Sequence, residues 1–320
     1  MEQLPKGANF VRSKMLWEIG LHIAGNPATP YGGNRDMVIC VGSGSGDRFR
    51  PWLRLATGSA ILAEGVVKGD VEAAFVNPSA LLTQAYRGVG LFKTPLPVRI
   101  ICNYPSWDRF VMAFHPRTGI RSVADIKAKK YPLRVSVRED PTHSTIVLID
   151  QIFALHGFTL ADIEGWGGKL VRCGGPGDER RRLEPMARGE IDGVFDEGIK
   201  VWLAEALAAG LAPIGFDASE YEQLGKLGWR RVTVPRSVFP GLPHDVDTID
   251  FSGWPIYCNA SLPEQTAYDI CAAVAARDVE MPWEKMAGGN AIQAVTETDA
   301  TPMDVPLHPG AERWLREQGK

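Results

Sequence analysis

Two stretches of the chain carry the same short pattern, and this echo constrains the fold more than any other feature. Residues 68–78 read KGDVEAAFVNP and residues 188–198 read RGEIDGVFDEG. A base, glycine, acid, branched residue, acid, two small residues and phenylalanine therefore recur in one order. Each copy follows a helical pattern, which predicts that Gly69 and Gly189 take the left-handed position at a helix end. The echo predicts two short buried strands, each entered from a helix, although two unrelated helix-to-strand turns would look the same.

The residues that follow these strands are the first candidates for a binding site. In open α/β sheets, ligands bind beyond the carboxyl ends of the strands. Two sets of residues are therefore expected to face a shared cleft: Asn77, Pro78 and Ser79, and Asp196, Glu197 and Gly198. Because Asp196 and Glu197 are adjacent, a strand would direct them to opposite faces, which weakens any mechanism based on paired carboxylates.

Strands and helices alternate elsewhere in the chain as well. Residues 133–137 and 251–259 read as strands, and residues 146–157 have the apolar spacing of a helix that ends at a glycine. The sequence SLPE at 261–264 reads as a capping box that opens a further helix. This alternation predicts an α/β fold.

Two segments are expected to carry the chain between two lobes. Residues 100–116 contain two apolar runs, and residues 232–243 are punctuated by proline. We therefore assign residues 1–116 and 236–320 to one lobe and residues 117–235 to the other. A cleft between two lobes is a preferred place for a small-molecule site.

The loop GSGSG at residues 42–46 resembles a phosphate-binding loop but has the wrong spacing. A dinucleotide fingerprint needs a small residue at the sixth position, where this chain has Asp47, and no Gly-Lys-Ser/Thr triplet follows. The middle residue of the five is Gly44 rather than the serine of a nucleophile elbow. We expect a loop at the edge of the cleft and no nucleotide.

Two loops rich in hydroxyl groups are candidates to hold an anion. The first is PTHST at residues 141–145, and the second is TGS at residues 57–59. A loop that opens a helix exposes backbone N–H groups at the positive end of the helix dipole, which suits a carboxylate. Serine and threonine are also ordinary N-caps, so a purely structural role stays open for either loop. The residues predicted to bind the ligand here are Ser59, Thr142, His143, Ser144 and Thr145.

Other side chains complete the candidate site. Aromatic residues give a large contact area, so Tyr104, Trp107, Trp166 and Trp254 are candidate cleft walls. Arg138 and Arg172 could pair with a ligand carboxylate, whereas DERRRLE at 178–184 reads as a solvated helix face. If the protein is an enzyme, the residues to suspect are His143, Glu197 and Arg138.

Composition excludes several classes of function. A net charge of −3 and a pI near 6.1 do not favour nucleic acid as a partner. Five scattered cysteines form no Cys-x-x-Cys pair, and the histidines show no ligand spacing, so we predict no metal and no cofactor. No stretch has the apolar length of a membrane helix, and no signal peptide is visible at the start. As written, the chain is expected in the cytoplasm, or in the periplasm if a leader is missing from it.

Taken together, five stretches resemble the solute-binding proteins of the TAXI group, the receptor subunits of one class of tripartite (TRAP) transporters. The stretches are 57–80, 119–137, 141–163, 188–198, and 245–270 with 307–319. The resemblance implies a two-lobed type II periplasmic-binding-protein fold that closes on a small organic acid or amino acid, with TRAP membrane subunits as partners. It implies that the site lies at residues 57–59, 77–79, 142–145 and 196–198.

The chain departs from that family in two places. Residues 7–25 look like the family's first helix, with almost nothing ahead of them, and residues 42–51 look like an enlarged loop. In the second-lobe loop, Glu139, Asp140 and His143 replace a sequence richer in glycine. Two other functions therefore stay open: a cytoplasmic enzyme of decarboxylase or cofactor-biosynthesis type on the same fold, and a cytoplasmic ligand sensor.

Overall fold

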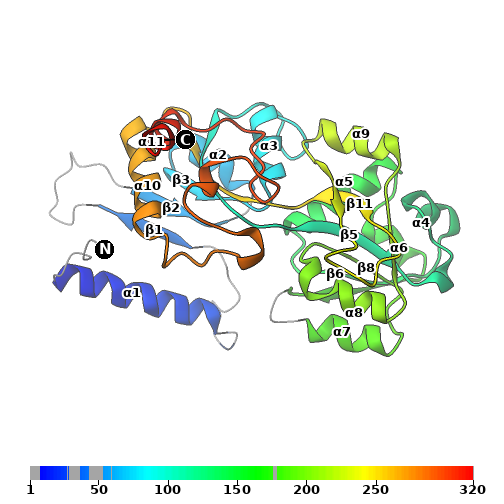
Figure 1. Ribbon diagram of the computed structural model, residues 1–320. Coiled ribbons are helices and arrows are strands. Elements are labelled where there is room, and N and C mark those ends of the chain that lie inside the picture. The colour runs from blue at the N-terminus through cyan, green and yellow to red at the C-terminus, as the bar shows by residue number, and fades with distance from the viewer. Residues whose placement is uncertain are drawn as a thin grey trace.

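The computed structural model describes residues 8–26, 28, 37–42, 53–58, 60–175 and 179–319. Within them the chain forms two lobes, each built around one β-sheet (Figure 1). The first sheet holds five strands in the order β1 (Val38–Val41), β2 (Leu53–Ala56), β3 (Ala73–Phe75), β12 (Trp254–Asn259) and β4 (Val98–Tyr104). Strands β2 and β3 are parallel, and the other neighbours in this sheet are antiparallel.

The second sheet holds the remaining strands. Its order is β10 (Arg231–Val234), β11 (Val246–Asp250), β5 (Arg109–Phe114), β8 (Gly193–Asp196), β6 (Arg134–Arg138) and β7 (Lys169–Cys173), and β9 (Ala212–Ile214) also pairs with β5. Strand β6 runs parallel to both of its neighbours.

Helices accompany both sheets, so the predicted α/β class is confirmed. The first lobe carries α1 (Ala8–Gly25), α2 (Leu62–Lys68), α3 (Ser79–Arg87), η3 (Lys285–Ala287), η4 (Gln293–Val295), α10 (Glu264–Ala276) and α11 (Pro309–Glu317). The second carries η1 (Pro116–Thr118), α4 (Val123–Lys129), α5 (Ser144–Leu155), α6 (Leu160–Gly165), α7 (Arg180–Ala187), η2 (Ile199–Val201), α8 (Leu203–Ala208) and α9 (Ala218–Lys226).

The sequence echo corresponds to the same structural unit in both lobes. Gly69 and Gly189 both take left-handed backbone conformations, with φ of 83° and 69°, just after α2 and α7. The strands that follow, β3 and β8, lie in the interior of their sheets. Both parts of that prediction are confirmed.

The chain passes between the sheets at residues 105–108 and again at residues 251–253. Strand pairing fixes both places, because β4 and β12 belong to the first sheet while β5 and β11 belong to the second. Residues 232–243, where we expected the second passage, instead connect β10 and β11 of the same sheet. Proline marked a long turn there rather than a change of lobe.

The predicted capping box at 261–264 is also absent. Helix α10 begins at Glu264 with Pro263 in the capping position, and the proline side chain has no acceptor with which to cap the helix.

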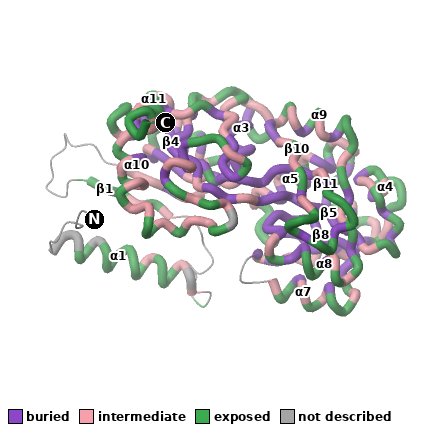
Figure 2. The backbone as a smooth tube through the Cα atoms, viewed as in Figure 1, coloured by how far each residue is buried: buried purple, intermediate pink, exposed green. Residues whose placement is uncertain are grey.

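Buried side chains join the two lobes on one side. One apolar cluster contains Leu81 and Leu82 of α3 together with Ile149 and Phe153 of α5. Figure 2 shows buried backbone continuing from one lobe into the other. The lobes are therefore packed against each other along α3 and α5.

Candidate functional site

The first turns of two helices, one from each lobe, meet at the candidate site. Asn77 lies between β3 and α3, and Ser144 is the first residue of α5. The Ser144 hydroxyl donates a hydrogen bond to the Asn77 carbonyl oxygen. Further along the same helices, Gln84 and Gln151 exchange side-chain amide hydrogen bonds of 3.2 and 3.1 Å. The two helices therefore run side by side with their N-termini at the same end.

This arrangement places two positive helix ends together. The first amide groups of each helix have no acceptor within the helix, and their dipoles favour negative charge. Alongside them, the Asn77 side-chain oxygen is buried without a hydrogen-bond partner among the described residues. The pair of N-termini suits an anionic group, and the amide oxygen suits a donor such as a hydroxyl or ammonium group.

The other ligand-binding candidates near the start of α5 make contacts close to that helix. The His143 ring nitrogen Nδ1 accepts from the Thr145 amide and so caps the helix. Thr142 is exposed and bonds to Asp140 at 2.8 Å through both its amide and its hydroxyl, while Thr145 is fully buried. Ser144 is the predicted loop residue that the structure brings to Asn77.

Ser79 connects this region to the chain passages between lobes. Its amide donates to the Ser252 carbonyl at 3.2 Å, and its hydroxyl accepts from Asn103 at 3.0 Å. Gly253, with φ of 77°, allows this approach, since a Cβ there would lie 2.4 Å from the Ser79 hydroxyl. Pro78 is buried at the start of α3.

The end of β8 forms a buried cluster of charges. Asp196 binds Arg138 Nε at 2.8 Å and also pairs with Arg182, while Glu197 pairs with Arg138 Nη2. The alternation of faces expected for a strand does not apply to this pair, because β8 ends at Asp196 and Glu197 lies in the bend that follows. The Gly198 amide donates to both carboxylate oxygens of Asp108, at 3.0 and 3.1 Å.

Arg182 corrects the interpretation of residues 178–184 as a solvated face. Its side chain is 3% exposed and donates to Ser136 at 2.8 Å as well as to Asp196. A run of charges in sequence could not reveal that one of them turns inward to meet a carboxylate on a neighbouring strand.

Glu197 holds a proton near neutral pH. Burial raises its pKa to about 8, and the nearby carboxylate of Asp108 adds to the effect. Arg138 opposes this shift, but its guanidinium is shared with Asp196, so its attraction does not prevail. Burial also raises the pKa of Asp108, although the hydrogen bond with Glu197 lowers it. The shared proton therefore resides on Glu197.

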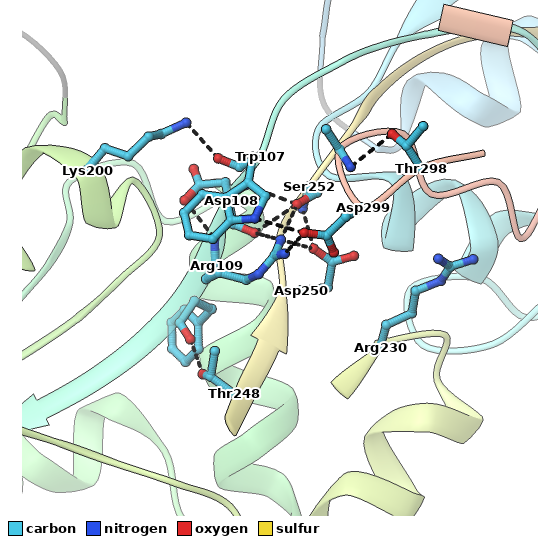
Figure 3. Close-up of polar contacts among 12 residues, drawn as sticks. Trp107, Asp108, Arg109, Lys200, Arg230, Thr248, Asp250, Ser252, Thr298 and Asp299 are labelled. Atoms are coloured by element: carbon cyan, nitrogen blue, oxygen red, sulfur yellow. Dashed lines mark hydrogen bonds and ion pairs between the residues drawn. The ribbon is translucent and has the colours of Figure 1, made fainter. Parts of the chain in front are cut away.

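A second cluster, centred on the buried Arg109 and missed by the sequence analysis, fixes the passages between lobes (Figure 3). Arg109 binds Asp250 at 2.9 Å, Ser252 at 2.5 Å and Asp299 at 2.5 Å, and its guanidinium lies 4.4 Å from the centre of the Trp107 ring. Ser252 both accepts from the Asp108 amide and donates to its carbonyl, each at 3.0 Å. Contacts through Ser252 and Asp108 thus run from Ser79 to Gly198.

The predicted cleft walls separate into two groups. Tyr104 and Trp254 stack with their ring centres 5.0 Å apart, beside the passages. Trp166 instead packs against Phe158 inside the second lobe, 5.8 Å between centres, so its assignment as a cleft wall is wrong. Its aromatic partner Phe158 comes from the loop after α5, and nothing in the sequence pattern pairs the two residues.

Several other predicted features lie away from this region or outside the described residues. Arg172 lines a surface hollow of about 800 Å³ between α5, α6 and β7, and another of about 560 Å³ lies beside α7 and α8. Ser59 and most of the glycine loop, residues 43–52, fall outside the described residues. Among the residues described, no group of three or more acidic, histidine or cysteine side chains could hold a metal ion. No described helix has the length and apolarity to span a membrane.

Several solved structures match the chain at low identity and with TM-scores below 0.5. A TctC solute-binding protein from Polaromonas is 13% identical, with 81% of this chain and 80% of that one covered and a TM-score of 0.33. A ferric-binding protein from Bordetella is 13% identical over 79% and 78% of the two chains, with a TM-score of 0.34. A structure described as a periplasmic transporter is 14% identical over 81% and 79%, with a TM-score of 0.33.

The sequence itself gives the family assignment. Residues 55–319, which include both copies of the echo and both helix starts at the site, match the NMT1-like family. The chain belongs to the NMT1-like family.

Proposed function

We propose that this protein is a solute-binding protein that closes on a small organic acid or amino acid between its two lobes. The observation that supports this most directly is the meeting of the α3 and α5 N-termini at Asn77 and Ser144. The two positive helix ends repel each other when they lie side by side, and a carboxylate bound between them removes this repulsion. A ligand ammonium or hydroxyl group would satisfy the Asn77 side-chain oxygen.

Ligand entry in this proposal requires the lobes to separate at the site. Ser144 and Asn77 contact each other directly, so a ligand must displace or widen that contact. Receptor subunits of TRAP transporters, the TAXI group among them, work by such closure, and we propose TRAP membrane subunits as partners. The protein would act in the periplasm if a leader precedes residue 1, and as a cytoplasmic ligand sensor otherwise.

The experiment is a thermal-shift screen of small carboxylates, followed by calorimetric titration. A ligand that binds only the folded state stabilises it by about 2.7 kcal/mol at one hundred times its Kd. We expect carboxylates to raise the Tm and their uncharged amides to leave it unchanged. Ser144→Ala should weaken the affinity for the best carboxylate at least tenfold, because it removes a hydroxyl from the first turn of α5.

Ser122→Ala is the matched control for this experiment. Ser122 caps α4 of the same lobe by accepting from the Asp125 amide. Its loss should cost about 1 kcal/mol of stability without changing affinity. The proposal is refuted if no carboxylate shifts the Tm, or if Ser144→Ala binds the ligand as tightly as the parent protein.

One observation favours an enzyme as the second candidate. A buried carboxyl with a pKa of about 8, as at Glu197, is suited to proton transfer near neutral pH. However, Glu197 and Arg138 are paired with each other, and His143 caps α5, so each of the three already has a structural role. Mass spectrometry of the bound compound separates the two functions, because a binding protein returns it unchanged.

A further inference from the structure

Three aromatic rings form a continuous row beside the passages between lobes. Tyr104, at the end of β4, stacks on Trp254 with 5.0 Å between ring centres and 19° between planes. It stacks on Trp283 at 5.5 Å and 26°. Trp254 and Trp283 make no ring contact with each other in the described chain, so Tyr104 lies between them.

The Trp283 end of the row is closed and anchored. The Trp283 indole donates to the Asp278 carbonyl at 2.8 Å, and the Tyr104 hydroxyl donates to the Pro282 carbonyl. Gly289 packs directly on Trp283, since a Cβ at this glycine would lie 2.8 Å from the tryptophan Cβ and 3.1 Å from its ring. These contacts hold the planes of the row in fixed orientation.

The Trp254 end of the row is open. Trp254 is 40% exposed, and Tyr104 is its single ring neighbour among the residues described. Its indole N–H donates to no group in that same part of the chain. A rigid aromatic face with an unused donor is therefore presented at the start of β12.

Strand register shows which way this face is directed. Trp254 pairs with Tyr104 on the β4 side of β12. On the other side, Ile256 pairs with Phe75 of β3, and the Val76 amide donates to the Pro255 carbonyl at 3.1 Å. Continuing this register places Asn77 opposite Trp254, so the open face lies on the side where Asn77 meets Ser144.

We propose that the open face of Trp254 stacks against an aromatic ring of the ligand, so that the solute is an aryl carboxylate. This inference rests on the proposed function, since the carboxylate is held at the α3 and α5 N-termini. A ring placed there continues an existing stack of three. A cationic ligand group would be bound less strongly beside the row, because the nearby carboxylate of Glu284 already pairs with Lys200 at 2.5 Å.

The test compares ligands that differ only in aromaticity. Benzoate and phenylacetate would be titrated against cyclohexanecarboxylate and cyclohexylacetate, with trimethylglycine as a cationic probe. Stacking of one ring pair predicts about a 2- to 10-fold preference for each aromatic acid. In Trp254→Leu this preference should disappear, while Trp254→Phe should retain part of it. Trp17→Leu is the control, because Trp17 is equally exposed, at 41%, on α1.

The outcomes separate this inference from the proposed function. Equal affinity for aromatic and saturated acids, or a preference that survives Trp254→Leu, overturns the stacking role and leaves carboxylate binding intact. A preference for trimethylglycine that depends on Trp254 overturns the choice of an aryl ligand. If none of the carboxylates binds, the proposed function and the inference both fail. Circular dichroism of each variant confirms that loss of preference is not loss of fold.

Discussion

Replacing Glu197 with glutamine should make the protein less sensitive to alkaline pH. The Glu197 side chain is 9% exposed and lies against Asp108 and the shared guanidinium of Arg138. Glutamine has the same shape, keeps a hydrogen-bond donor towards Asp108, and cannot ionise. It therefore imitates the protonated form of Glu197 at every pH.

The size and sign of the effect follow from the pKa of Glu197. Burial and Asp108 raise the pKa of Glu197 from 4.5 to about 8. Between pH 4.5 and pH 8 the folded protein therefore keeps a proton on this carboxyl that the unfolded chain has lost. Stability contributed by this proton is complete below pH 4.5 and is lost as the pH rises through 8. One pKa unit corresponds to about 1.4 kcal/mol, which gives an upper limit of about 5 kcal/mol. Because the proton is shared with Asp108, we expect about 2 to 5 kcal/mol.

The assay is urea unfolding of the parent protein and Glu197→Gln between pH 5 and 9. Their free energies of unfolding should agree within about 1 kcal/mol at pH 5, and the variant should become the more stable one towards pH 8.5. Glu190→Gln is the control, since this glutamate pairs on the surface with Arg188 at 2.8 Å, and the difference there should not change with pH. A constant difference for Glu197→Gln across the range would refute a neutral, buried Glu197.

Three further measurements probe individual contacts of the folded protein. Gly253→Ala should lower the free energy of unfolding in urea by at least about 1 to 2 kcal/mol, because the alanine side chain would sit on a left-handed backbone and against Ser79. Unchanged stability would contradict that geometry. Asp196→Ala should cost about 3 to 5 kcal/mol, since it leaves two buried arginines without their shared carboxylate, and a smaller loss would mean that they find other partners. Burial opposes ionisation of Asp192, but hydrogen bonds from Arg134 and Arg117 outweigh this effect and hold the pKa of Asp192 at about 2. The free energy of unfolding should therefore fall by about 2 kcal/mol as the pH drops from 4 to 2, and Asp192→Asn should lack this fall.

Local signals in the sequence predicted the framework of the site. The two left-handed glycines, the strands after them and the start of α5 depend on neighbours a few residues away. For the same reason Asn77 and Ser144 could be singled out without knowing that they touch. Both residues lie at a strand or helix end, where backbone geometry alone makes a residue available to a ligand.

Contacts between distant segments were not predictable from these signals. Arg182 looked like part of a solvated run until its carboxylate partner on β8 was placed beside it. Arg109, Asp250 and Asp299 come from three separate parts of the chain, and no spacing in the sequence relates them. The second passage between lobes was misplaced because proline signals a turn but does not say which sheet the next strand joins.

The two sides of the joint between the lobes differ in strength, and this difference predicts where it opens. Along α3 and α5 the lobes share buried residues such as Leu81 and Ile149, each worth about 1.5 to 3 kcal/mol. On the side of the aromatic row, Lys200 pairs with Glu284, and their side chains are 25% and 21% exposed. Arg109 also pairs with Asp299, whose side chain is 64% exposed. A partly exposed pair of this kind contributes about 1 kcal/mol or less. Opening should therefore begin at Lys200 and Glu284 and pivot about the buried residues of α3 and α5, and the contact between Asn77 and Ser144 should widen after the ion pair breaks.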